Sequence, residues 1–245
     1  MKIRFAGIPR LIRLRRSVPS LLGVVLLSAI AISVLSPFAR GKSDSGLAPD
    51  KGKLRIIVNG APIGEEDYDI SPGAGGWVAR GTSEIQSPQG AVHVTGTLSI
   101  RPDGSPLRYD WSTSGPKKAS STIEFNGTSA TAELHLEGMR PYTQQFTFNS
   151  PHILVLDNNL YHQYDILARL YDWDKKGVQT FSVIVPQEMT PGTITADSVG
   201  KQDFNGKNCE ELVVKTEDLE LNVYVDGPRL MGIVVPASGV QILRQ

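Results

Sequence analysis

The chain has 245 residues, with 25 Lys and Arg against 25 Asp and Glu, and 40% of its residues are hydrophobic. This composition excludes a disordered or collagen-like chain and allows an ordinary packed core. The charges are unevenly placed: residues 1–41 hold seven of the 25 bases and no acid, so the remainder carries 18 bases against 25 acids, a net charge of −7. An acidic body lacks the electrostatic footprint for phosphate backbones, so we expect no nucleic-acid partner.

The N-terminal segment has the pattern of an export signal. Six bases up to Arg16 precede the uncharged apolar run Val18–Leu35, and a basic start followed by such a run is typical of exported proteins. Ala39 and Gly41 supply small residues at the spacing that a signal peptidase uses, so we expect cleavage after Gly41. The alternative is an uncleaved signal anchor, with the basic end left in the cytoplasm. In both cases the body is periplasmic or secreted, and only the N-terminal segment meets the membrane.

After this signal peptide or anchor (residues 1–41), residues 42–53 are rich in Gly, Ser and charged residues, which is the composition of a linker. From Leu54 onward, apolar and polar residues alternate with a period of two. The clearest runs are residues 92–100, 130–137 and 219–226, and one-sided alternation indicates an antiparallel sheet with one wet face. We find no internal boundary and expect a single domain over residues 54–245.

Turn signals separate the predicted strands. Asn-Gly or Asp-Gly dipeptides start at positions 59, 103, 126, 205 and 226, and these dipeptides accept the positive φ values of tight hairpins. The Gly-rich stretch Ser71–Gly76 is predicted to be a loop. Counting the runs gives about ten to twelve strands, more than an open twisted sheet carries without curling. We therefore predict a mainly β fold: a long antiparallel meander curled into a half-barrel or barrel.

One segment has helical periodicity instead. Leu160, Tyr164, Leu167 and Tyr171 recur at helical spacing after the capping residues that start at Asp157. The apolar surface of such a helix needs cover, so we expect the sheet to curl around it. With the hydrophobic export helix in front, this completes the predicted fold.

No motif for catalysis, cofactor binding or metal binding emerges. The four His residues are scattered without a His-x-x-x-His pair, so no zinc site is predicted. The acidic run Glu65-Glu66-Asp67 lacks the spaced ligands of a calcium loop and is expected to be solvated. The single cysteine, Cys209, cannot form an internal disulfide and is expected to be a small, half-buried hydrophobic side chain.

Aromatic and aliphatic side chains offer a candidate binding surface. They fall in elements that should face one another across a curled sheet, where they either enclose an apolar cavity or fill the core. The candidate ligand-lining residues are Trp77, Trp111, Phe146, Phe148, Leu160, Tyr161, Tyr164 and Leu167.

Three blocks carry a resemblance to known proteins. Residues Leu54–Gly64, Pro106–Trp111 and Leu156–Tyr171 resemble uncharacterised exported bacterial β-proteins, and the predicted meander around a helix is similar in topology to the half-barrel of periplasmic lipoprotein carriers. The resemblance implies a hydrophobic concave face able to hold an acyl chain. It carries over no catalytic residue.

The leading functional hypothesis is therefore a non-enzymatic cell-envelope protein that binds an apolar, lipid-like ligand or an envelope protein on a concave β-sheet. Two alternatives stay open. One is a secreted hydrolase, or an accessory module of an enzyme, whose polar residues converge only in the folded chain. The other is a structural or interaction protein that offers a sheet edge to a partner.

Overall fold

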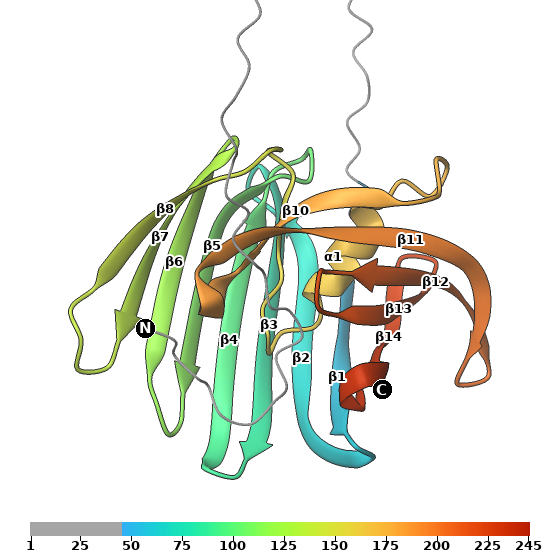
Figure 1. Ribbon diagram of the computed structural model, residues 1–245, viewed down its shortest axis with the longest axis horizontal. Helices are drawn as coiled ribbons and strands as arrows, with labels where there is room; N and C mark the ends of the chain where they lie inside the picture. The colour runs from blue at the N-terminus through green and yellow to red at the C-terminus, as the bar shows by residue number, and fades with distance from the viewer. Residues whose placement is uncertain (1–45) are drawn as a thin grey trace, which may run out of the picture.

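A computed structural model describes residues 46–245 (Figure 1). The predicted export segment, residues 1–41, lies outside the described residues. Strand β1 (Asp50–Val58) begins four residues before Leu54, the predicted start of the domain. It does so because Asp50 to Lys53 already pair with Ile70 to Asp67 of the next strand, which overrides their linker-like composition.

The secondary structure consists of 15 strands, one α-helix and two short 3₁₀ helices in the described part of the chain. After β1 come β2 (Ala61–Gly73), β3 (Gly76–Ser87), β4 (Gly90–Ile100), β5 (Pro106–Ser114), β6 (Ala119–Asn126), β7 (Ser129–Leu136) and β8 (Tyr142–Thr147). Next are β9 (Ile153–Val155), α1 (Gln163–Leu170), β10 (Gln179–Val185), η1 (Pro186–Glu188) and β11 (Thr190–Phe204). The chain ends with β12 (Lys207–Lys215), β13 (Glu220–Asp226), β14 (Arg229–Val235), η2 (Pro236–Ser238) and β15 (Val240–Arg244).

All strands belong to one sheet with the order β8-β7-β6-β5-β4-β3-β2-β1-β15-β14-β13-β12-β11-β10-β9. Each neighbouring pair is antiparallel except β9 and β10, which are parallel. The first and last strands meet in the middle, where Leu54 lies opposite Arg244. The prediction of a mainly antiparallel meander with one helix is confirmed, although the strand count of ten to twelve was too low.

The strands that were not predicted from the sequence lie where the alternation of apolar and polar residues is weak. Strand β2 carries Glu, Asp and Gly in place of a clear apolar face, and the predicted loop Ser71–Gly76 belongs to a hairpin instead. Gly73 pairs with Gly76 across a two-residue turn. Two Gly residues in this stretch supply the positive φ that the turn needs, with Gly75 at +80° and Gly76 at +155°.

Two of the predicted Asn-Gly turns have the expected geometry. Asn59 and Asn205 have φ values of 50° and 53°, and the Gly after each has a φ near +80°, as in type I′ hairpins. At Gly127 the turn is shifted by one residue, because Asn126 still pairs with Ser129. Gly127 then occupies the first central position, where a type II′ turn requires a positive φ.

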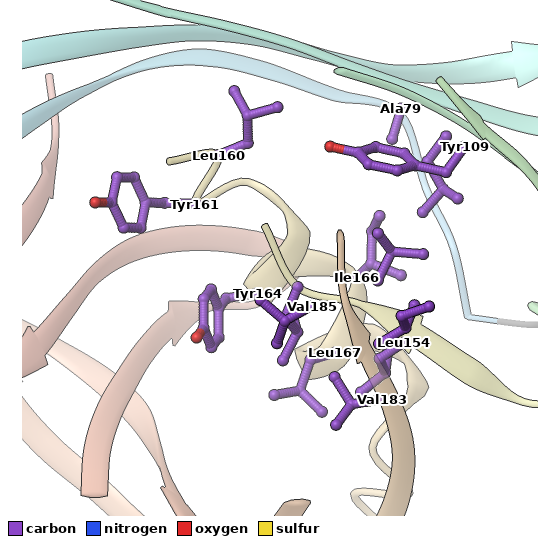
Figure 2. Packing of buried hydrophobic residues seen from close by; sticks show 14 of the residues in the cluster. Ala79, Tyr109, Leu154, Leu160, Tyr161, Tyr164, Ile166, Leu167, Val183 and Val185 are labelled. Atoms are coloured by element: carbon purple, nitrogen blue, oxygen red, sulfur yellow. The ribbon is translucent and has the colours of Figure 1, made fainter. Parts of the chain in front are cut away.

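The inner face of the sheet and α1 form one hydrophobic core. Figure 1 shows the sheet curving around α1, and the helix packs against β9, β13 and β14. The edge strand β9 also packs against β5 in the opposite half of the sheet, so curvature brings the two halves together over the helix. Figure 2 shows Tyr164, Leu167 and Val185 within this packing.

The helix is shorter than its periodicity predicts. It begins at Gln163, whereas the helical spacing starts at Leu160. Residues 157–160 form a turn closed by an isolated bridge between Asp157 and Leu160. The buried carboxylate of Asp157 also accepts a hydrogen bond from the backbone N–H of Asn159, at 2.8 Å, so this segment has partners for its polar groups without becoming helical.

Candidate functional site

The candidate ligand-lining residues come together, but they lie in the packed interior. Leu160, Tyr161, Tyr164 and Leu167 are fully buried at α1 (Figure 2). Burial raises the pKa of the Tyr161 phenol far above its usual value. The structure places their side chains among other core side chains.

The remaining four candidates belong to the same hydrophobic cluster. Trp111, Phe146 and Phe148 are buried on the inner face of the N-terminal half of the sheet. Trp77 is partly buried and packs against the cluster from the start of β3. Sequence periodicity thus identified inward-facing residues, while a role in ligand binding stays a prediction.

An open groove lies beside these residues, at the C-terminal end of α1. Its volume is about 470 Å³. It is lined by Gly46, Asp103, Ser150, His152, Arg169, Leu170, Tyr171, Asp172, Thr180 and Phe181. The groove therefore combines apolar side chains with polar ones. Its residues come from α1, β10, the segment before β1 and the loops that precede β5, β9 and β10. None of the eight sequence candidates lines it.

The apolar side of the groove continues toward the core. Leu170 also lines a very small space of about 10 Å³ between β9 and the β4–β5 half of the sheet. The other residues around that space include Leu98, Ile100, Leu154 and Ile166. In the sheet order, β9 pairs only with β10, so side-chain packing joins its other side to β5. An apolar seam without backbone pairing thus adjoins the groove at Leu170.

The polar residues of the groove include two acids, Asp103 and Asp172, and the basic side chains of His152 and Arg169. Hydrogen bonds from Ser105 lower the pKa of Asp103, so this carboxylate stays charged at neutral pH. Asp172 is exposed at the other side of the rim. The guanidinium of Arg169 does not balance these charges, because its partner is the buried carboxylate of Asp165, 2.8 Å away.

A buried acid anchors the start of α1 to the sheet. Glu66 of β2 lies in the core, although the acidic run around it was predicted to be solvated. Its carboxylate accepts hydrogen bonds from the backbone N–H groups of Tyr161 (2.6 Å) and His162 (3.3 Å). The Nδ1 atom of His162 lies 2.5 Å from the same carboxylate. Because His162 provides no side-chain cap for the helix, Glu66 supplies this capping from across the core.

The alternation of inward and outward residues along β2 could have predicted the burial of Glu66. Glu66, Tyr68 and Ile70 are all buried, whereas Glu65 lies on the outer face and pairs with Lys53. A period of two starting from Ile70 places Glu66 on the inner face. The acidic neighbours in sequence concealed this position.

A second buried carboxylate holds the turn before α1. Asp157 accepts a hydrogen bond from the hydroxyl of Tyr109 at 2.8 Å, and its backbone N–H donates to Gln163 Oε1 at 2.5 Å. Burial raises the pKa of Asp157 to about 6. The contact ties the turn before α1 to β5.

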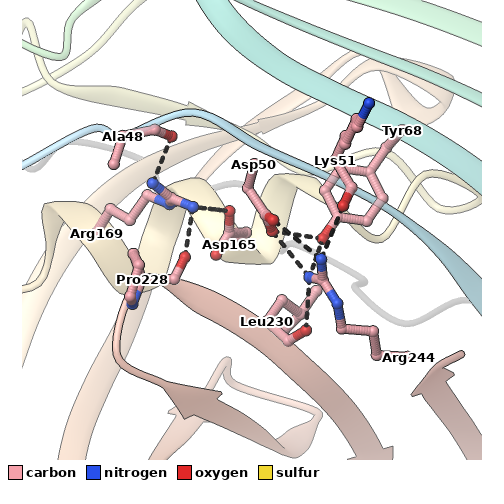
Figure 3. Close-up of polar contacts among 9 residues, drawn as sticks. All are labelled: Ala48, Asp50, Lys51, Tyr68, Asp165, Arg169, Pro228, Leu230 and Arg244. Atoms are coloured by element: carbon pink, nitrogen blue, oxygen red, sulfur yellow. Dashed lines mark hydrogen bonds and ion pairs between the residues drawn. The ribbon is translucent and has the colours of Figure 1, made fainter.

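Two arginines form polar contacts near the middle of the sheet, where the first and last strands meet, as Figure 3 shows. Arg169 of α1 donates to the carbonyl oxygens of Ala48, at 2.6 Å, and Pro228. Arg244 of β15 forms two hydrogen bonds with Asp50, at 2.8 and 2.9 Å. The ring of Tyr68, which also donates a hydrogen bond to Asp50, stacks on His162.

The hydrolase alternative requires acid or base side chains that can reach a substrate. Glu66, His162 and Asp157 are all in the core, and none of them lines the groove. A general acid or base needs hydrogen-bond reach to the reacting atoms. In this arrangement the network instead joins α1 and the preceding turn to the sheet.

Metal-ligand clusters and membrane-spanning helices are both absent from residues 46–245. No cluster of three or more His, Cys, Asp or Glu in this range is arranged to hold a metal ion. Within the same range, no helix has the length and hydrophobicity to cross a membrane. Cys209 is a free cysteine, and it is fully buried where the sequence predicted a half-buried side chain.

Comparison with known proteins identifies a structural relative. The chain is similar to a crystal structure described as a beta-barrel-like protein of a domain of unknown function, DUF1849, from Brucella abortus. The TM-score is 0.52 at 8% sequence identity, and the match covers 81% of this chain and 95% of that one. No protein-family model matches the chain, and no curated protein matches it in sequence. The likeness agrees in fold with the resemblance to uncharacterised bacterial β-proteins.

Proposed function

We propose that this is a non-enzymatic binding protein of the cell envelope that holds a lipid-like amphiphile in the groove beside α1. The observation that carries the proposal is the groove itself, about 470 Å³ in volume, with apolar Leu170 and Phe181 next to a polar rim. Ligand sites in proteins are concave, largely apolar and supplied with a few polar groups that orient the ligand.

The seam at Leu170 favours a chain-shaped ligand. Side-chain packing alone joins β9 to β5, so an acyl chain could separate them without breaking backbone hydrogen bonds of the sheet. The lipid tail would lie along this seam, on the concave side of the sheet. Such a site matches the acyl-chain binding implied by the similarity to lipoprotein carriers.

The rim favours a head group that carries a positive charge. Asp103 and Asp172 are both on the rim, and the charge of Arg169 is already paired with Asp165. A free fatty acid would place its carboxylate near these acids, which is unfavourable. The chemistry therefore favours a zwitterionic or cationic amphiphile over an anionic one.

Export is part of the proposal. Residues 1–41 have the pattern of a signal peptide or anchor. We place the domain in the periplasm or outside the cell, either released by cleavage after Gly41 or tethered through residues 18–35. There it would meet lipids or proteins of the envelope.

The proposal is tested with two probes that share a twelve-carbon tail. The full chain is expressed in a bacterial host that exports it, and the exported protein is purified. Dodecylphosphocholine and dodecanoate are then titrated into this protein below their critical micelle concentrations. Trp173, which contacts Tyr171 edge to face at 5.0 Å, reports binding by its fluorescence. We expect saturable binding of dodecylphosphocholine and weaker binding of dodecanoate.

A matched pair of variants locates the site. Phe181→Ala removes an apolar wall of the groove and should weaken dodecylphosphocholine binding about tenfold, the effect of roughly 1.4 kcal/mol. Phe204→Ala removes an equally half-buried ring that stacks on Tyr224 outside the groove, and should leave binding unchanged. Absence of saturable binding to the wild-type chain, or equal effects of the two variants, would refute the proposal.

A further inference from the structure

Strand β8 forms an open edge of the sheet. It is the terminal strand in the order and pairs only with β7 within the described residues. Figure 1 shows it at the outer margin of the sheet. Its sequence, Tyr-Thr-Gln-Gln-Phe-Thr, contains no charge. Charged residues, bulges or covering loops usually protect edge strands from pairing with another chain, so the neutral composition of β8 is distinctive.

The hydrogen-bond register identifies which groups are available. The backbone N–H of Phe148 donates to Thr128 on the β7 side, at 2.8 Å, and Phe146 lies opposite Ala130 in the same register. Backbone groups alternate in direction along a strand. The N–H and C=O groups of Thr143, Gln145 and Thr147 therefore point away from β7, outward from the sheet.

We propose that two copies of this chain pair antiparallel through β8, with Gln145 of each copy opposite Gln145 of the other. This register places Thr143 opposite Thr147 and lets all three outward residues pair with one another. A shift by two residues in one direction brings Pro141, which has no N–H, into the ladder, and a larger shift in the other direction brings in Pro151. Among these registers, the one centred on Gln145 pairs the three outward residues exclusively with one another.

Side chains on the two faces are complementary in this register. On the outer face, Thr143 and Thr147 form cross-strand pairs, which favour antiparallel sheets. On the inner face, Tyr142 of one copy lies opposite Phe148 of the other. Tyr142 is 52% exposed in the single chain, a high value for an aromatic residue. Pairing would cover it with a second aromatic ring, and no charged side chain of β8 opposes the contact.

The interface is one short strand from each copy, so we expect a weak dimer. Sedimentation velocity on the full chain, purified as a bacterial host exports it, should detect dimers at about 200 µM and monomers at low micromolar concentration. Gln145→Lys places two like charges at the symmetry axis and should raise the dissociation constant at least tenfold. Gln86→Lys makes the same exchange at an exposed position of β3, which is paired on both sides, and should have no effect.

A cysteine variant tests the register directly. Residues opposed in a hydrogen-bonded antiparallel pair have Cα atoms about 5.5 Å apart, within the range that a disulfide spans. Gln145→Cys should form a disulfide-linked dimer under mild oxidation, whereas Gln86→Cys should not. Cys209 is buried and does not compete. A monomeric wild-type chain, a dimer insensitive to Gln145→Lys, or equal crosslinking of the two cysteine variants would overturn the proposal.

Discussion

Glu66 and His162, which are 96 residues apart in the chain, meet in the core with Oε1 and Nδ1 2.5 Å apart. The contact joins β2 to the start of α1. The same carboxylate accepts backbone hydrogen bonds from Tyr161 and His162, so it takes the place of a local helix cap. Glu66 therefore fixes the N-terminal end of α1 to the sheet, while the groove lies at the other end of the helix.

The first prediction is that Glu66→Ala strongly destabilises the fold. It removes the acceptor for two backbone N–H groups and leaves His162 buried without its carboxylate, and losing one member of a buried pair costs about 3–5 kcal/mol. Denaturant unfolding followed by circular dichroism measures the loss. Glu84→Ala removes an exposed glutamate beside His93 and should cost less than about 1 kcal/mol. Equal costs for the two variants would contradict this role for Glu66.

Periodicity predicted the parts of the fold that depend on burial alone. The runs around Val94, Ala132 and Val223 proved to be strands with those residues facing inward. The helix was also located, because its buried side chains repeat every three to four residues. The spacing of buried residues follows from the local geometry of a strand or a helix, so it can be recognised in a single sequence.

The parts that were missed depend on long-range contacts. Glu66 is buried because Tyr161 and His162 satisfy its carboxylate, and no local pattern signals partners so far along the chain. The groove was missed for a similar reason: His152, Arg169 and Phe181 belong to different elements and approach one another only when the sheet curves.

The second prediction concerns pH. Burial raises the folded-state pKa of Asp157 from an ordinary 3.8 to about 6, so the folded chain binds this proton more tightly than the unfolded chain. The stabilisation is complete below pH 3.8 and is lost as the pH rises through 6. A shift of two pKa units corresponds to about 3 kcal/mol. Asp157 should therefore make the chain more stable at pH 5 than at pH 7.

The measurement for Asp157 is a comparison with Asp157→Asn over pH 4 to 7. The variant lacks the titrating group, so the difference in unfolding free energy between the two chains should change by about 2.4 kcal/mol from pH 4 to pH 7. As the pH rises, the stability of Asp157→Asn should therefore increase relative to that of the wild type. A constant gap would show that Asp157 does not titrate in this window.

The third prediction concerns the close approach between β4 and the turn before α1. A Cβ atom at Gly96 would lie 2.5 Å from Leu160 Cδ1 and 2.6 Å from the hydroxyl oxygen of Tyr109. Both neighbours are fully buried, and Tyr109 is held by its hydrogen bond to Asp157. Gly96→Ala should therefore cost about 1–3 kcal/mol through overpacking.

Thermal unfolding followed by circular dichroism compares Gly96→Ala with Thr95→Ala, a change on the exposed outer face of the same strand. Thr95→Ala should lower the midpoint of thermal unfolding far less than Gly96→Ala does. A larger effect at Thr95 would indicate that strand propensity, rather than crowding against Leu160, governs this part of the sheet.

The fourth prediction separates the two functions of Arg169. Its guanidinium compensates the buried carboxylate of Asp165 and also donates to the carbonyl oxygens of Ala48 and Pro228. The Arg169 and Asp165 side chains are 3% and 1% exposed. Arg169→Met should cost about 3–5 kcal/mol at pH 7, because it leaves a buried charge without a partner. At pH 5 the cost should be smaller, because burial raises the pKa of Asp165 to about 6 and the acid then becomes neutral.

The double variant Asp165→Asn with Arg169→Met completes the cycle. Removing both charges relieves the electrostatic penalty but not the lost bonds to Ala48 and Pro228, so the double variant should regain part of the stability that Arg169→Met loses. Unfolding free energies of the wild type and three variants at pH 7 measure the coupling. If the double variant is as unstable as the sum of the single changes, the carbonyl contacts hold α1 against the sheet and the ion pair contributes nothing.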